Sequence, residues 1–148
     1  MALSVDGNSP FIRDPRRSDQ AYVASTWRSS LLCGDRRITR GDANRLVDRY
    51  LDLPGTRILI ASDSKVSDAI WGWIAYWQGE KATRGPRVLH YLYVREPKRR
   101  AGYATELVRR AWPGNDGPII WSLEGPDAYW LVSKYKNAVR ISEEEVFK

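Results

Sequence analysis

Residues 88–108, VLHYLYVREPKRRAGYATELV, contain the pattern that decides the fold. The apolar run from Val88 to Val94 predicts a strand, and a short basic loop connects it to a helical pattern that begins near Gly102. The first N–H groups of a helix have no intrahelical partners, and the helix dipole adds partial positive charge beside them. Because anions bind at such helix starts, the segment predicts a phosphate-binding turn.

The positive charge of the chain is concentrated around this turn. The formal net charge of the 148 residues is +6. Residues 84–110 contain eight basic and two acidic residues, so their excess equals that of the whole chain. Such a field attracts a bound phosphate, and it also attracts nucleic acid. A solvated helix face is the alternative explanation for Arg109 and Arg110.

Length and composition limit the class of protein. A chain of 148 residues with 43% hydrophobic residues predicts one folded domain, here residues 10–148, after a flexible leader at 1–9. The single cysteine and single histidine exclude a disulfide framework, a zinc quartet and a His-rich metal site. No apolar run approaches the roughly 20 residues of a membrane span. Because the beginning of the chain lacks a signal-peptide pattern, we expect a cytoplasmic protein with no membrane partner.

The rest of the sequence alternates between helical and strand patterns. We expect strands at 11–13, 57–61, 69–77, 87–94, 118–123 and 138–141, and helices after Ser18-Asp19, after Thr39, at 103–112 and at 127–136. Segments 57–61 and 69–77 read as an antiparallel hairpin, with Ile70, Gly72, Ile74 and Tyr76 on one side and Trp71, Trp73, Ala75 and Trp77 on the other. The predicted class is mixed α/β, a mostly antiparallel twisted sheet of about six strands flanked by about four helices, in the order β-α-α-β-β-β-α-β-α-β.

This order, with the turn in its place, resembles the GNAT superfamily of acyl-CoA-dependent N-acyltransferases. The residues that match its central pattern are Val94, Pro97, Arg99, Gly102 and Ala104. The opening Ile12-Arg13 and Asp19 also resemble the first strand and first helix start of the family. The similarity covers roughly residues 10–135. Arg-x-x-Gly-x-Ala is a short pattern by itself, and its position after the fourth strand makes it more specific.

The resemblance implies acetyl-CoA, or another acyl-CoA, as cofactor and small-molecule partner. Backbone groups of Leu92 and Val94 would pair with the pantetheine arm as an added strand does. Arg99 would add a charged contact to the pyrophosphate. The backbone amides that would hold this group belong to Arg100, Ala101, Gly102, Tyr103 and Ala104, and glycine lets the chain approach it without a Cβ. A turn that only packs helix on strand is the structural alternative.

The reaction implied by the resemblance is direct attack of an amine on a thioester, helped by a base and by an acid near the leaving thiolate. The family commonly takes the acid from a tyrosine in the last helix, but the matching position here is Val132. Tyr129 and Tyr135 lie three residues on either side of it and would share its helix face. We rank Tyr129 first because it is nearer the helix start. A core or rim aromatic is the alternative role for each.

His90 is the first candidate for the base. Some family members carry a catalytic glutamate at the position that matches Val88, so that group is absent here. Strand alternation puts His90 on the same side as Leu92 and Val94, and an imidazole titrates in the useful range. Glu124, at the end of the next strand, is the second candidate. A half-buried histidine with satisfied hydrogen bonds is the structural alternative.

The acceptor side of this fold is built by the first two helices, where Trp27, Arg28 and Ser29 are the candidate substrate-binding residues. Residues 25–30, Ser-Thr-Trp-Arg-Ser-Ser, with the strand at 89–94, resemble small GNAT-like proteins encoded by bacteriophages. One such branch, the Mom-like proteins, modifies adenine in phage DNA. A DNA-modification enzyme, with DNA as partner in the host cytoplasm, is therefore an alternative function. A non-catalytic CoA- or nucleic-acid-binding module is another.

Overall fold

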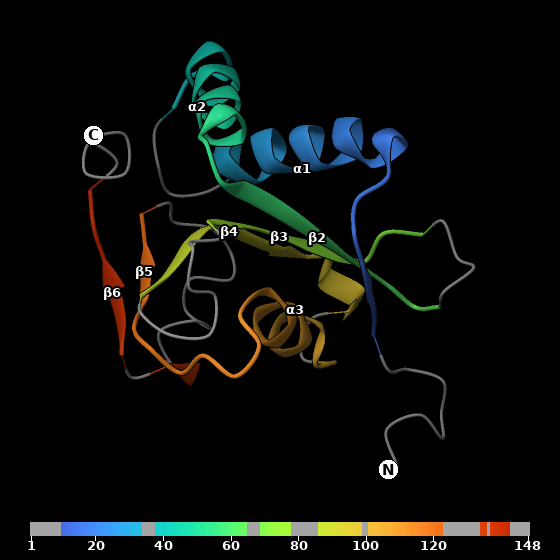
Figure 1. Cartoon of the computed structure of the whole chain (residues 1–148). Helices are drawn as coiled ribbons and strands as arrows, with labels where there is room; N and C mark the ends of the chain where they lie inside the picture. Colours follow the sequence, from blue (N-terminus) through green and yellow to red (C-terminus); the bar gives the residue numbers. More distant parts are fainter. Residues whose placement is uncertain are drawn as a thin grey trace.

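The computed structural model describes residues 10–33, 38–64, 69–77, 86–98, 101–122, 134–135 and 137–142. Its strands are β1 (Phe11–Arg13), β2 (Thr56–Ser62), β3 (Gly72–Trp77), β4 (Arg87–Val94), β5 (Ile119–Trp121) and β6 (Ala138–Arg140). Its helices are α1 (Gln20–Leu32), α2 (Arg40–Asp52) and α3 (Tyr103–Ala111), with short 3-10 segments η2 (Arg17–Asp19) and η3 (Glu96–Lys98). Figure 1 shows their arrangement.

The six strands form one mixed sheet in the order β1-β2-β3-β4-β5-β6. The pairs β1–β2, β2–β3 and β3–β4 are antiparallel, and β4–β5 and β5–β6 are parallel. The predicted mixed class, the six strands and the hairpin are therefore confirmed. The predicted leader at 1–9 and most of the predicted helix at 127–136 lie outside the described residues.

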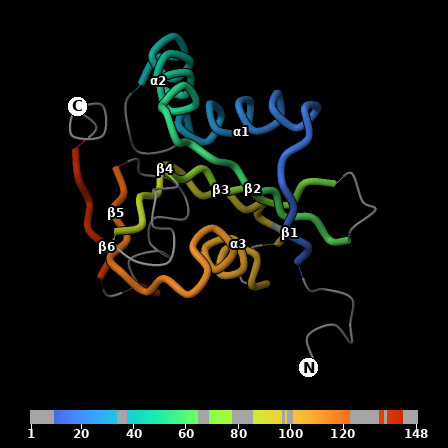
Figure 2. Tube along the Cα trace, viewed as in Figure 1, coloured from blue at the N-terminus to red at the C-terminus, as the bar shows by residue number. Residues whose placement is uncertain are grey.

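Helices cover both faces of the sheet. Figures 1 and 2 show α1 and α2 on one face and α3 on the other. Each face has its own buried cluster. Trp27, Tyr50 and Trp73 are buried on the α1/α2 face, and Ile74 and Leu107 are buried on the α3 face. Each helix is therefore held by its apolar side against the sheet.

Alternation along β3 gives its two faces as predicted, except at the residues before the strand begins. Ile74 packs on the α3 face, and Trp73 packs on the α1/α2 face. Ile70 belongs to the cluster with Trp73, and Trp71 packs against the cluster with Ile74, so the predicted sides of these two residues are wrong. Both precede Gly72, the first residue of β3, so the strand's alternation does not fix their directions.

The helix starts differ in how they are capped. The predicted cap at the start of α2 is confirmed, because the Thr39 side chain accepts a hydrogen bond from the N–H of Asp42. Asp19 occupies the N-cap position of α1, as the helix start predicted after Ser18-Asp19 requires, but its side chain makes no capping hydrogen bond there. Asp19 is buried, and its carboxylate accepts hydrogen bonds from the side chain of Arg13 and the backbone N–H of Arg16. It therefore ties β1 to η2 and not the first turn of α1.

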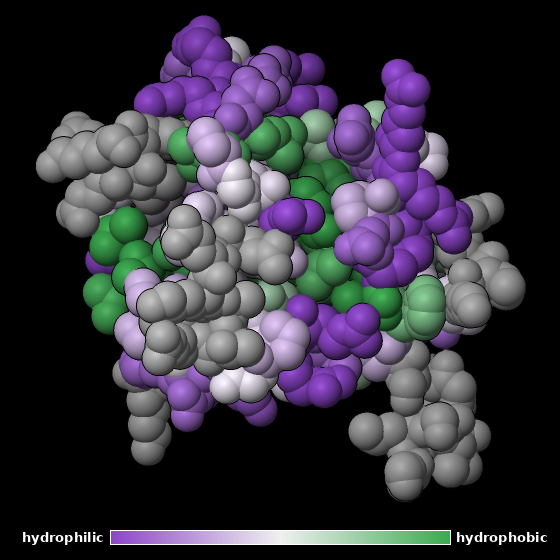
Figure 3. Space-filling model, viewed as in Figure 1, coloured by the Kyte–Doolittle hydropathy of each residue, from purple (hydrophilic) through white to green (hydrophobic). Residues whose placement is uncertain are grey.

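Hydrophilic side chains cover the end of the molecule formed by α2, and hydrophobic residues reach the surface in a band at the level of the sheet (Figure 3). Among the described residues, the large hydrophobic side chains that are exposed are Leu32, Trp77 and Val139. None of the described helices combines the length and the apolar character that crossing a membrane requires.

Candidate functional site

Among the described residues, the pairing between β4 and β5 covers the first part of β4. It runs from Arg87 opposite Ile119 to Leu89 opposite Trp121, where β5 ends. β4 continues to Val94, paired there with β3. We call the point where the β4–β5 pairing ends, at Leu89 and Trp121, the strand junction.

An irregularity in β4 lies directly after the strand junction. Ala75 of β3 is opposite Tyr91, but the next residue, Tyr76, is opposite Leu89. His90 is therefore the additional residue of a β-bulge, which bends a strand and interrupts its ladder.

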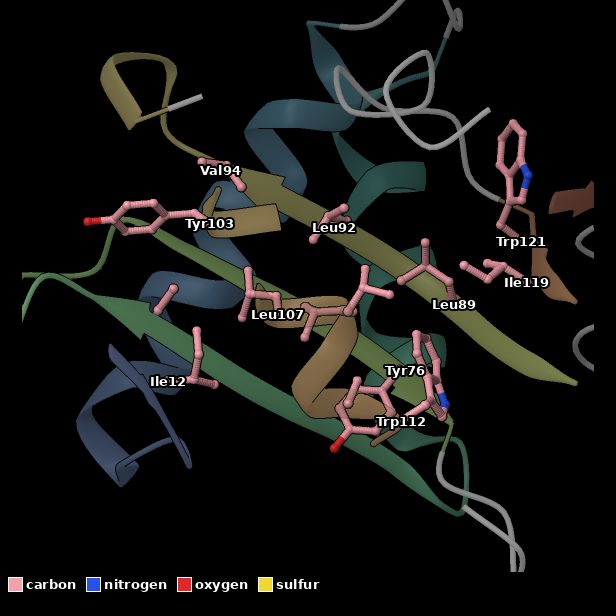
Figure 4. Close-up of a cluster of buried hydrophobic side chains, with 14 residues drawn as sticks. Ile12, Tyr76, Leu89, Leu92, Val94, Tyr103, Leu107, Trp112, Ile119 and Trp121 are labelled. Carbon is pink, nitrogen blue, oxygen red and sulfur yellow. The ribbon is translucent and has the colours of Figure 1, made fainter. Parts of the chain in front are cut away.

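The bulge changes which side of the sheet His90 faces. Leu89, Leu92 and Val94 belong to the cluster on the α3 face, as Figure 4 shows. The His90 ring instead lies 5.1 Å, between centroids, from the ring of Tyr50 in α2. The prediction that His90 shares a side with Leu92 and Val94 is therefore wrong, because the additional residue resets the alternation.

Beyond the strand junction, the backbone of β4 has a defined direction. The N–H of Arg95 donates to the carbonyl oxygen of Trp71 at 2.8 Å, so the chain pairs with the β3 side at Arg95. Backbone groups in a strand alternate between its two edges. Alternation therefore directs the backbone of Leu92 and Val94 to the edge opposite β3, where β5 has ended. An extended ligand arm could add to this edge as a strand would.

The turn after β4 begins α3 without a side-chain cap from the described residues. Gly102 occupies the cap position with a positive φ of 87°, a conformation that favours glycine. Apart from Gly102 and its two chain neighbours, no heavy atom of the described residues lies within 4 Å of the place where a Cβ would stand. The first helical hydrogen bond runs from the N–H of Glu106 to the carbonyl of Gly102. The N–H groups of Tyr103, Ala104 and Thr105 thus precede the intrahelical ladder, which is the arrangement an anion requires.

Side chains beside the turn have different roles. Tyr103 is buried in the α3-face cluster, and burial raises the pKa of its phenol, so its contribution to the turn is its backbone. Cations gather over Trp71: the Arg95 guanidinium carbon and the Lys98 ammonium nitrogen each lie 4.7 Å from its ring centroid. Ala101 is exposed, and the predicted Arg99 and Arg100 lie outside the described residues.

His90 is 2% exposed and lies among polar groups of the α1/α2 face. Its Nε2 is 3.3 Å from the hydroxyl oxygen of Thr56, the first residue of β2. Burial lowers the pKa of His90 from 6.5 to about 4. The expectation that this imidazole titrates near neutral pH is therefore wrong, because the desolvated ring resists protonation. At neutral pH it is an uncharged hydrogen-bonding group.

Two further hydrogen bonds, one buried and one part-buried, lie on the same face. The hydroxyl groups of Tyr50 and Ser122 are 2.5 Å apart, and those of Ser30 and Tyr91 are 2.6 Å apart. Ser122 directly follows β5, so its bond holds the end of that strand to α2 at the strand junction. These residues and Thr56 were missed by sequence reasoning. The serine that follows the apolar run of β5, Ser122, was a weak signal of a buried hydrogen bond. Tyr50 gave no such signal, because its spacing on α2 fits an ordinary apolar helix face.

Tyr135 lies away from the turn. The guanidinium carbon of Arg87, the first residue of β4, is 5.4 Å from its ring centroid. Tyr135 also packs against the α3-face cluster. Its ring contact with a charged side chain is thus at the first residue of β4, five residues before Leu92. The other two catalytic candidates, Tyr129 and Glu124, lie outside the described residues.

The three predicted acceptor-side residues lie on α1 with different exposure. Trp27 is fully buried, and its ring is 5.3 to 5.7 Å from those of Trp73, Tyr91 and Tyr50. It is therefore a core residue enclosed by aromatic rings of the sheet and of α2. Arg28 is half-buried and Ser29 is exposed, so both remain accessible.

Comparison of the whole fold identifies similar solved structures. A possible acetyltransferase from Clostridium difficile 630 is 14% identical, with a TM-score of 0.54 over 86% of this chain and 88% of that one. AAC(6')-Iy, in complex with the bisubstrate analogue CoA-S-monomethyl-acetylneamine, is also 14% identical, with a TM-score of 0.53 over 86% of this chain and 88% of that one. The aminoglycoside acetyltransferase meta-AAC0020 from an uncultured soil metagenomic sample, in complex with sisomicin, is 13% identical. Its TM-score is 0.51 over 90% of each chain.

These similarities concern the fold. The GNAT-like architecture predicted from the sequence is confirmed. No protein-family model matches the chain, and no curated protein matches it either. The matched structures give no support to a phage DNA-modification relationship.

Proposed function

We propose that this protein is an acyl-CoA-dependent N-acyltransferase, with acetyl-CoA as the expected donor and an amine as the acceptor. One observation carries the proposal: the strand junction and the uncapped start of α3 follow each other along β4, within the span from Leu89 to Tyr103. An extended arm and its phosphate group need these two features in this order. Acetyltransferases with the same fold, one of them in complex with a bisubstrate CoA analogue, support it.

The residues at the proposed donor site fit CoA. The backbone edge at Leu92 and Val94 suits the amide-containing pantetheine arm, and the N–H groups after Gly102 suit the pyrophosphate. The open space in front of Gly102 admits that group. Lys98 supplies positive charge beside the turn, as Arg99 and Arg100 do in the proposal drawn from the sequence. When bound, acyl-CoA supplies an activated thioester carbonyl for attack by the amine.

The proposed role of His90 follows from its burial. A neutral imidazole accepts a hydrogen bond from the amine N–H and orients the nitrogen lone pair toward the carbonyl. With a pKa of about 4, it takes the proton only after bond formation has made that nitrogen acidic. It is thus proposed as a late proton acceptor. Glu124 is retained as the alternative base and rests on the sequence alone.

The proposed proton donor and acceptor-side residues follow from the placements above. Tyr129 is preferred over Tyr135 as the acid near the leaving thiolate, because Tyr135 lies against Arg87 at the beginning of β4. Arg28 and Ser29 are retained on the acceptor side, and Trp27 is withdrawn because its ring packs against three aromatic rings of the core.

The test is a thermal-shift series with acetyl-CoA and CoA. At 100 times Kd, a ligand adds about 2.7 kcal/mol of stability. A stabilisation of this size raises the Tm of a chain of this length by roughly 5–10 °C. Gly102→Val should abolish the rise, because it places a branched side chain in the phosphate space.

Gly114→Val is the matched control. Gly114 also has a positive φ, 71°, so the backbone strain is comparable, and beyond its two chain neighbours no heavy atom of the part of the chain that the structure describes lies within 4 Å of the position that its Cβ would take. The variant should lower the starting Tm as Gly102→Val does and keep the ligand-induced rise. If no acyl-CoA raises the Tm of the unaltered protein, the proposed function is wrong.

A further inference from the structure

The hydroxyl of Thr56 is shared between two buried groups. It donates to the carbonyl oxygen of Tyr50 at 3.0 Å, and the Nε2 of His90 lies 3.3 Å from the same hydroxyl oxygen. A hydroxyl has one proton and can otherwise only accept. Because a carbonyl can only accept, the proton of Thr56 is committed to Tyr50. Thr56 therefore offers His90 a lone pair, and Nε2 must carry the hydrogen.

The other ring nitrogen follows from this assignment. A neutral imidazole carries one N–H, so Nδ1 has a lone pair and no proton. Nδ1 is buried and has no hydrogen-bond partner among the residues that the structure describes. A buried acceptor without a partner is costly, so a donor bound beside Nδ1 would be stabilising.

We propose that Thr56 is a positioning residue that holds His90 as the Nε2–H tautomer, so that Nδ1 presents its lone pair to an N–H of the bound substrate. The identity of that donor as the acceptor amine rests on the proposed function, whereas the tautomer does not. The bulge explains why the pair can form, since it turns His90 to the face on which Thr56 lies.

The surroundings of His90 support a neutral ring. Tyr50 of α2 faces it with its ring, and Thr56 of β2 faces it with its hydroxyl. Burial lowers the pKa of His90, and no charged side chain of the described residues contributes to that shift. The proton on Nε2 is therefore set by one hydroxyl and not by an ion pair.

The tautomer can be measured directly, because His90 is the single histidine of the chain. In a ¹⁵N-labelled sample without ligand, long-range ¹H–¹⁵N correlation spectra at pH 7 should show Nε2 protonated and Nδ1 unprotonated. Thr56→Val removes the hydroxyl at nearly constant shape, and the two nitrogen shifts should then move toward each other as the tautomers mix. Thr56→Ser keeps the hydroxyl and should restore the original spectrum.

Thr26→Val is the matched control for the loss of a threonine hydroxyl on the same face of the sheet. The Thr26 hydroxyl accepts from the indole N–H of Trp73 and donates to the carbonyl oxygen of Tyr22, so its hydrogen bonds do not involve His90. The variant should leave both imidazole shifts in place. A spectrum of the unaltered protein with the proton on Nδ1, or an unchanged spectrum in Thr56→Val, would overturn the assignment.

Turnover separates this inference from the proposed function. With acetyl-CoA and an accepted amine, Thr56→Val should lower kcat about tenfold, equal to about 1.4 kcal/mol, with KM for acetyl-CoA unchanged. Thr56→Ser should recover kcat to within about twofold of the starting value. If the spectra behave as expected but no acyl transfer occurs with any amine, the proposed function fails and the tautomer stands. If transfer occurs and Thr56→Val leaves kcat unchanged, the positioning role fails.

Discussion

Arg13 and Asp19 form a buried ion pair, with the Nη1 of Arg13 2.6 Å from the Oδ2 of Asp19. The same carboxylate accepts from the N–H of Arg16, so the chain between β1 and α1 closes on one side chain. The carboxylate of Asp19 therefore joins β1, at the edge of the sheet, to the segment that leads into α1.

Asp19→Asn should destabilise the fold by about 3 kcal/mol, because it leaves the Arg13 guanidinium buried without its counter-charge. The hydrogen bond from Arg13 is the largest cause that lowers the pKa of Asp19 below 3.8. The stabilisation that the ionised Asp19 contributes is therefore present above pH 3.8, and it is lost as the pH falls through the lower pKa that Asp19 has in the folded state. Urea denaturation between pH 2 and pH 7 measures both effects. Equal stability of the variant at pH 7 would contradict this account.

His90 should give a separate pH dependence at higher pH. Its pKa is about 4 when folded and 6.5 when unfolded, so the unfolded chain binds more protons between these values. The contribution of neutral His90 to the free energy of unfolding should be fully present above pH 6.5. It should fall by up to about 3 kcal/mol as the pH is lowered to 4, at 1.36 kcal/mol per pH unit. In His90→Gln the free energy of unfolding should stay level over this interval. A similar slope in both proteins would show that another group titrates there.

Tyr50 and Ser122 should be energetically coupled. Tyr50→Phe leaves the buried Ser122 hydroxyl without its partner and should cost about 1–2 kcal/mol, and Ser122→Ala should cost a similar amount. The double variant should lose less than the two single losses added together, by at least about 0.5 kcal/mol. A double-mutant cycle by chemical denaturation measures this difference. Strict additivity would mean that the hydrogen bond contributes nothing.

Trp27 and Arg28 should behave differently although they are adjacent on α1. Trp27→Ala empties a fully buried aromatic site and should cost about 3–5 kcal/mol. Arg28→Ala removes a half-buried side chain that is not in the core and should change stability by less than about 0.5 kcal/mol. If Arg28 serves the acceptor side, its variant should raise KM for the amine and leave KM for acetyl-CoA unchanged. Denaturation curves and steady-state kinetics on the two variants distinguish these roles.

The strands and helices could be predicted because their apolar spacing is local information. The start of α3 could be predicted for the same reason, since Gly102 interrupts the pattern at the residue where φ is positive. The bulge at His90 could not be predicted from the sequence. Residues 88–94 are apolar or aromatic at nearly every position, as expected of a strand covered on both faces, so a shift in register leaves no mark on the pattern.

The hydrogen bonds around His90 were also beyond the reach of the sequence. Thr56 is 34 residues from His90, and Tyr50 is 72 residues from Ser122. Both pairs depend on the sheet order and on the packing of α2, which no local window contains. The low pKa of His90 follows from the same packing, so the sequence alone suggested an ordinary imidazole.

The single additional residue in β4 also bears on how fast a ligand can enter. Leu92 and Val94 are buried on one face of the sheet and Tyr91 is buried on the other, so a slip of this segment by one position would exchange buried side chains between the two faces. Packing on both faces therefore fixes the register of β4 beyond the bulge. If this part of β4 binds the donor as proposed, we expect association there to need no prior shift of the strand.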